Sequence, residues 1–81
     1  MSRKLKVLSG NNVVKILEKY GFSITRTVGS HVRMTGNKDT LSFHITIPMH
    51  KELKKGTLSG ILRALEGKIN RDDLEEDFYN K

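Results

Sequence analysis

The residues of this chain that are best suited to acid–base chemistry are its three histidines, His31, His44 and His50. An unperturbed imidazole titrates close to neutral pH, so it can accept or donate a proton there. His31 directly follows the pair Gly29-Ser30, which is typical of a tight turn, and should therefore open a strand at the rim of a sheet. From the residues alone, His31 is either a general base or an exposed residue at the start of a strand.

The other two histidines have plainer interpretations. His44 lies between Phe43 and Ile45, which favours a place on a sheet face with contacts across strands. His50 lies beside Lys51 in a polar segment and is either a loop residue or a phosphate contact.

Several other chemistries are not supported by the sequence. It contains no cysteine, and its histidines lack the spacing of a zinc site, which needs about four closely placed ligands. It has no Gly-x-Ser-x-Gly turn and no Walker or dinucleotide glycine pattern. We therefore expect no metal and no other cofactor. Because no apolar run is long enough for a membrane span or a signal-peptide core, and cysteine is absent, we expect a soluble cytoplasmic protein.

Charge is distributed unevenly along the chain. The net charge is +6, but residues 70–81 carry −3 and residues 1–69 therefore carry +9. A strongly cationic body favours a nucleic acid as partner, the plainer alternative being a basic protein with a solvated surface. We expect residues 1–69 to form the functional domain and residues 70–81 an acidic C-terminal extension, in which Asn70 caps a short helix docked through Leu74 and Phe78.

A cluster of three lysines, Lys51, Lys54 and Lys55, stands immediately before a second predicted helix. The free N–H groups and the positive dipole end of a helix start also attract anions. This cluster is therefore interpreted as a phosphate contact in preference to a solvated loop.

The first predicted helix covers residues 10–20. Ser9 can cap its start, and Gly21 suits a left-handed residue at its end. Its apolar residues recur at i, i+3, i+4 and i+7, and they are Val13, Ile16, Leu17 and Tyr20.

Residues 22–28 alternate between apolar and polar side chains, which is the period of a half-buried strand. The inward phase of this alternation contains Phe22, Ile24, Arg26 and Val28. Because a charged side chain is costly in a core, we expect Arg26 to lie near an edge of the sheet.

The Gly29-Ser30 turn should return the chain into a strand over residues 31–35, with Val32 and Met34 inward. A turn over residues 36–39 then leads to a third strand that ends at Pro48, the only proline. The inward residues of this third strand are Leu41, Phe43, Ile45 and Ile47.

A polar loop over residues 49–56 leads to a second helix, capped by Thr57 and ended by Gly67. Its apolar face is formed by Leu58, Ile61, Leu62 and Leu65. The order helix, three antiparallel strands, helix predicts a two-layer α+β domain in which both helices cover one face of a three-stranded sheet.

Five segments, in this order and spacing, resemble the HicA family of RNA-cleaving toxins. They are VKILEKYGF (14–22), GSH (29–31), IPMH (47–50), LKKGTL (53–58) and ILR (61–63). The resemblance extends over about residues 9–69. It departs from the family at Val32, where many members have a second histidine, and in the acidic tail, which runs beyond the usual core.

The resemblance implies a double-stranded-RNA-binding-like fold, metal-independent cleavage of mRNA, and inhibition by a HicB-type antitoxin. The family's catalytic histidine belongs to the Gly-Ser-His element and corresponds to His31. We expect this residue to act as general base on a ribose 2′-OH, with the general acid left open between a lysine, water and His50. The residues expected to contact RNA are Gly29, Ser30, Arg33, His50, Lys51, Lys54 and Lys55.

Two functions of other classes remain open at this point. One is a non-catalytic double-stranded-RNA-binding module that reads helix shape and 2′-hydroxyls. The other is a protein-interaction domain whose positive body binds an acidic partner.

Overall fold

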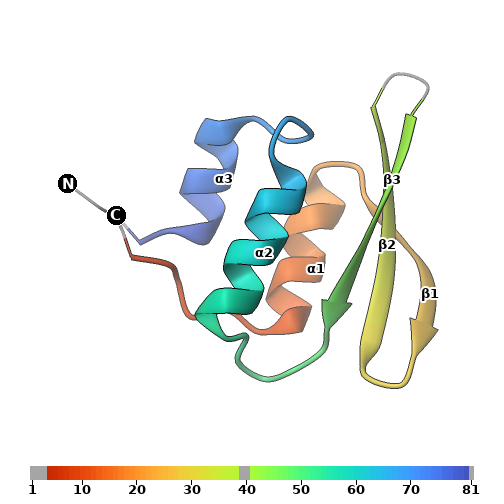
Figure 1. The fold of residues 1–81 in the computed structure, drawn as a ribbon, viewed down its shortest axis with the longest axis horizontal. Coiled ribbons are helices and arrows are strands. Elements are labelled where there is room, and N and C mark those ends of the chain that lie inside the picture. Colours follow the sequence, from red (N-terminus) through yellow and green to blue (C-terminus); the bar gives the residue numbers. More distant parts are fainter. Residues whose placement is uncertain (1–3, 39–40, 81) are drawn as a thin grey trace.

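The computed structural model describes residues 4–38 and 41–80, which form three helices and one sheet (Figure 1). In chain order the elements are α1 (Gly10–Lys19), β1 (Ser23–Val28), β2 (His31–Lys38), β3 (Leu41–Pro48), α2 (Lys55–Leu65) and α3 (Arg71–Phe78). The strands are antiparallel in the order β1-β2-β3. The expected α+β class and element order are confirmed, including the short C-terminal helix.

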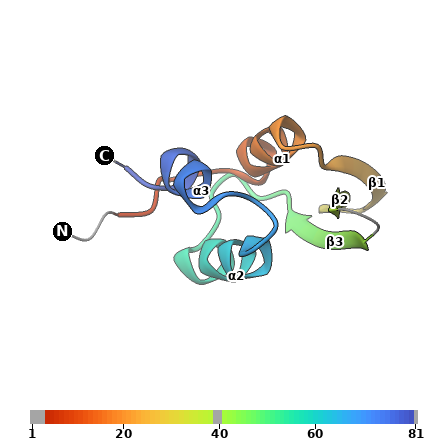
Figure 2. The same cartoon turned by 90° about the horizontal axis from the view of Figure 1, so that it is seen from above.

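The helices lie on one side of the sheet, and no described element covers the other side (Figures 1 and 2). A single apolar cluster extends from this face of the sheet past α1 and α2 to α3, which lies farther from the sheet (Figures 1 and 2), and the sheet contributes Val32, Met34 and Ile47 to it. The helices contribute Val13, Val14 and Leu17 from α1, Leu58, Ile61, Leu62 and Leu65 from α2, and Leu74 and Phe78 from α3. The covered face therefore provides the packing, and the open face is left for other roles.

Helix α1 begins and ends where the sequence predicts. The Ser9 hydroxyl accepts a hydrogen bond from the Asn12 amide at 3.0 Å, and the Asn12 side chain accepts one from the Ser9 amide at 2.9 Å. Gly21, with φ +91°, turns the chain away after the C-cap Tyr20.

Strand β1 differs from the expectation of a half-buried strand. All six of its residues are exposed, because β1 is an edge strand and its register shifts at a bulge between Ile24 and Arg26. Ile24 pairs with Met34 on the covered face, whereas Arg26 pairs with Arg33 on the open face. The edge position expected for Arg26 is confirmed, but the inward phase predicted for Arg26 and Val28 is wrong, since the bulge inverts the alternation after Ile24.

The turn expected over residues 36–39 is also wrong in part. Strand β2 continues to Lys38, and Gly36 pairs with Phe43 of β3. A Cβ atom on Gly36 would lie only 2.7 Å from the ring of Phe22, so glycine serves here for the close approach of an aromatic ring. Asp39 lies outside the described residues.

Helix α2 starts two residues before the predicted cap. Its N-cap is Lys54, with no side-chain hydrogen bond, and Thr57 lies in the first turn. The earlier start follows from an anchored loop: Leu53 is buried, and its amide donates to the Leu8 carbonyl at 2.8 Å. The predicted apolar face of α2 is confirmed.

Helix α3 is capped by Asn70, whose side chain accepts from the Asp72 amide at 2.8 Å, as expected. Asp77 ties it to α1 by an ion pair with Lys19 (2.8 Å) and a hydrogen bond from the Tyr20 hydroxyl. Burial alone would raise the pKa of Asp77, but these two donors outweigh it and hold the pKa below its ordinary value of 3.8. The acidic segment is thus part of the packed structure. No helix among the described residues has the length and apolar content to cross a membrane.

Candidate functional site

His31 is the first residue of β2 and lies between two strands. It pairs with Val28 of β1 on one side and with Pro48 of β3 on the other, and its side chain is exposed. The two-residue turn before it needs glycine, since Gly29 has φ +56°. The Ser30 carbonyl accepts a hydrogen bond from the Met49 amide at 2.6 Å. The backbone at His31 is therefore held from both sides, and its imidazole projects from a rigid element.

A shallow hollow of about 230 Å³ surrounds this imidazole on the open face of the sheet. It is lined by Arg26, Val28, His31, Arg33 and Thr46. No acidic side chain lines it, and neither arginine forms an ion pair with any described residue. The hollow therefore combines one group able to transfer a proton with two uncompensated positive charges.

His44 occupies a different part of the same face. Its Nδ1 lies 2.9 Å from the Thr35 hydroxyl, which lies 3.0 Å from the hydroxyl of Thr25. This cross-strand contact was predicted for His44 and is confirmed. The pair Arg33–Thr46 lies between the row of His44 and the row of His31, so the two imidazoles are not neighbours.

The remaining predicted contacts lie on the segment after β3. His50, Lys51, Lys54 and Lys55 are all exposed, and the lysines form no ion pair with a described residue. This segment and the β1–β2 turn lie at the same, lower edge of the molecule in Figure 1. The structure thus places the lysine cluster and His31 at one edge, although the lysines do not line the hollow.

A model of a known protein family matches most of the chain. The model of a family described as the HicA toxin of bacterial toxin–antitoxin systems matches residues 10–66. The chain belongs to the HicA toxin family. As a toxin of such a system, it pairs with an antitoxin. Neither the curated proteins nor the solved structures gave a match.

Residues 10–66, which match the HicA toxin family, include every residue that lines the hollow and all three lysines of the cluster. Sequence reasoning missed Arg26 and Val28, because strict alternation assigns both to the covered face, and it did not single out Thr46. For Arg26, the only signal in the sequence was an arginine in an otherwise apolar phase.

Gly10 is a position outside the hollow of this HicA toxin that the sequence also did not single out. A Cβ atom there would lie 2.2 Å from the Pro48 carbonyl oxygen and 2.7 Å from the Met49 Cα. The Gly10 amide also donates to the His50 carbonyl at 2.9 Å. The start of α1 thereby fixes the backbone that leads from the partner strand of His31 into the lysine segment.

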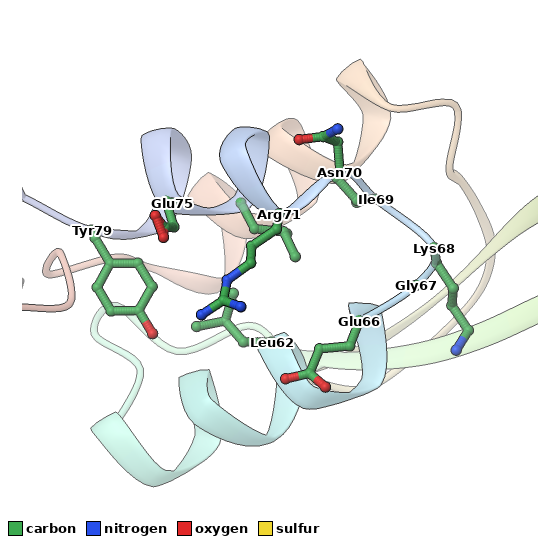
Figure 3. A pocket seen from close by; sticks show the side chains of 10 residues that line it. Leu62, Glu66, Gly67, Lys68, Ile69, Asn70, Arg71, Glu75 and Tyr79 are labelled. Carbon is green, nitrogen blue, oxygen red and sulfur yellow. The ribbon is translucent and has the colours of Figure 1, made fainter.

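A larger hollow, of about 830 Å³, lies between α2 and α3 and shares no residue with the hollow at His31 (Figure 3). Its walls carry charges of both signs, including Glu66, Arg71 and Glu75, and it contains no histidine. Most of its lining lies after residue 66, beyond the match to the HicA family. Within the described residues, no group of three or more His, Cys, Asp or Glu side chains is arranged to hold a metal ion.

Proposed function

We propose that this HicA toxin is a metal-independent endoribonuclease that cleaves mRNA, with His31 as the general base. The observation that carries the proposal is the position of His31: an exposed imidazole on a strand paired on both sides, in a hollow that is open to solvent and lined by two arginines and no carboxylate. The phosphodiester of RNA is the substrate class that such a combination suits, because the phosphate carries the negative charge and the neighbouring ribose supplies the 2′-hydroxyl.

In the proposed reaction, the His31 imidazole removes the proton of a ribose 2′-OH. The 2′-oxygen then attacks the adjacent phosphorus, the bond from phosphorus to the 5′-oxygen breaks, and the products are a 2′,3′-cyclic phosphate and a 5′-hydroxyl end. The leaving oxygen takes its proton from a lysine, from water or from His50. One positioned base supplies about 10²- to 10⁴-fold, so the rest of the acceleration must come from alignment and from cations beside the phosphate.

The cations that could stabilise the charge on the phosphate lie in two places. Arg33 lines the same hollow as His31. Lys51, Lys54 and Lys55 lie along the adjoining edge, where they are suited to bind phosphates on either side of the cleaved one. The Gly29-Ser30 turn offers backbone groups at the same edge.

We further propose that the partner is a HicB-type antitoxin that presents acidic groups to this edge and blocks RNA by occupying it. Hydrogen exchange on the complex should then show protection over residues 29–33. Protection confined to the helices on the far side of the sheet would reject inhibition by occupancy.

The decisive experiment is the variant His31→Ala, assayed in EDTA with a single-stranded RNA. We expect cleavage to fall by about 10²-fold or more, while the affinity for an RNA blocked with 2′-deoxy nucleotides falls only slightly. The fold should remain, because His31 is exposed and an exposed substitution changes stability by about 0.5 kcal/mol or less.

The matched control is His44→Ala, which removes an exposed imidazole from the same face but outside the hollow. It should retain cleavage close to that of the wild type. A folded His31→Ala protein that cleaves at the wild-type rate would contradict the mechanism. Duplex binding without any cleavage would instead favour a non-catalytic RNA-binding module, and absence of RNA binding would favour a protein-interaction domain.

A further inference from the structure

We infer that Arg26 is a phosphate-binding residue that, together with Arg33, holds the RNA phosphate beside His31. The inference rests on the proposed function and adds to it a residue that the sequence pattern assigns to the opposite face. Arg26 lines the hollow at His31 from β1, together with Val28, and it is the charged residue that this strand contributes.

Strand β1 contains a β-bulge that changes the face on which Arg26 lies. Ile24 pairs with Met34, and the next paired residue, Arg26, is opposite Arg33, so Thr25 is the additional residue. The Thr25 hydroxyl donates to the Arg33 carbonyl at 3.3 Å and contacts the Thr35 hydroxyl at 3.0 Å, which supports the irregular backbone. Bulges occur beside active sites, where they redirect a side chain. Here the bulge moves Arg26 from the helix-covered face to the face of His31.

The charges in the hollow favour an anion between Arg26 and Arg33. Arg26 and Arg33 are directly opposite each other on neighbouring strands, and like charges in this position destabilise a sheet. No acidic side chain lines the hollow to offset their repulsion, and no described residue forms an ion pair with either of them. An anion placed between the two side chains would remove this repulsion.

The guanidinium groups of two arginines match the geometry of a phosphate. The planar guanidinium donates two parallel hydrogen bonds to a pair of phosphate oxygens, and two such groups can hold both nonbridging oxygens. His31 occupies the next row of the same face, between Val28 and Pro48. A phosphate held by the two arginines would thus have its neighbouring ribose beside the imidazole.

A plainer role for Arg26 is protection of an exposed strand edge against pairing with another chain. That role requires only a charge on β1 and predicts no particular effect on phosphate binding. The two roles can therefore be separated by measuring binding directly.

The test compares Arg26→Gln and Arg26→Lys with the control Arg63→Gln, which removes an exposed arginine from α2. Adenosine 3′-monophosphate is titrated into each protein and followed by NMR of the backbone amides. In the wild type and in Arg63→Gln we expect shifts at Val28, His31 and Arg33. In Arg26→Gln the affinity should fall about ten-fold or more, because hydrogen bonds to charged groups contribute strongly.

Cleavage provides the second readout. Arg26→Gln should lower kcat, Arg26→Lys should restore part of the loss, and thermal melts should show intact folding. Equal affinity and equal cleavage for Arg26→Gln and Arg63→Gln would overturn the assignment.

The outcomes also separate this inference from the proposed function. If His31→Ala abolishes cleavage but Arg26→Gln behaves as the wild type, only the role of Arg26 fails. A second case is a wild type that cleaves no RNA and still binds adenosine 3′-monophosphate, as Arg63→Gln does, while Arg26→Gln does not bind it. In that case the phosphate site stands and the ribonuclease proposal fails.

Discussion

The two faces of strand β2 differ although they are built from alternate residues of the same eight-residue segment. On the covered face Val32 and Met34 are 5% and 0% exposed and lie in the apolar cluster. On the open face His31 and Arg33 are exposed and line the hollow. The difference shows that one strand can contribute to the core through one set of side chains and leave the alternate set exposed, because successive side chains point to opposite faces.

The largest effect expected from this comparison is on stability, at the covered face. Met34→Ala should lower the free energy of unfolding by about 2–5 kcal/mol, because it leaves a cavity among α1, α2 and the sheet. Arg33→Ala, one position earlier, should change it by only about 0.5 kcal/mol. Urea unfolding measures both variants, and similar losses for the two would contradict the division between the faces.

A smaller loss of stability is expected where α1 meets the end of β3. Gly10→Ala should cost about 1–3 kcal/mol, because the new Cβ would overlap the backbone at Pro48. The control is Gly60→Ala in α2, where a Cβ meets nothing within 4 Å, and there alanine should instead stabilise by about 0.4–1 kcal/mol. If both substitutions changed the free energy of unfolding in the same direction, the close contact at Gly10 would not be the cause of the loss.

On the functional side, replacing Lys51, Lys54 and Lys55 together by alanine should weaken RNA binding with little change in stability, since exposed charges contribute little to folding. Each lost phosphate contact should reduce the slope of log affinity against log salt by about 0.7. Binding measured over a series of salt concentrations tests this expectation. An unchanged slope would remove the segment from the RNA surface.

The smallest effect is expected at α3, far along the chain from the hollow. Because the pKa of Asp77 is lowered in the folded protein, its carboxylate stabilises the fold above the ordinary pKa of 3.8, and this contribution is lost as the pH falls through the lower folded value. Asp77→Asn should therefore lower the melting temperature by a few degrees at neutral pH, and the difference from the wild type should shrink in acid.

The same variant should cleave RNA at the wild-type rate, because Asp77 does not line the hollow at His31. Melting temperatures measured from neutral to strongly acidic pH test the first expectation. A difference that stays constant over this range would exclude the carboxylate as its source.

Local patterns in the sequence were sufficient for most of the fold. The Ser9 cap, the alternation of His31, Arg33 and Thr35 with Val32 and Met34, and the apolar face of α2 all depend on residues a few positions apart. Such features follow from the periods of 3.6 and 2 residues and from capping chemistry. The turn residues Gly29-Ser30 likewise predict that His31 begins a strand, which is its position in β2.

Tertiary structure decided the features that depend on a distant partner. The face on which Arg26 lies is decided by its pairing with Arg33 after the bulge. At Gly36 the strand continues through a glycine because the ring of Phe22 packs against it. The start of α2 is decided by the anchoring of Leu53 to Leu8. None of these leaves a periodic trace in the sequence, because the backbone of one segment adjusts to the neighbour that packs against it. The sequence by itself determined that His31 begins a strand after a glycine turn, and only the folded sheet decided which charges surround it.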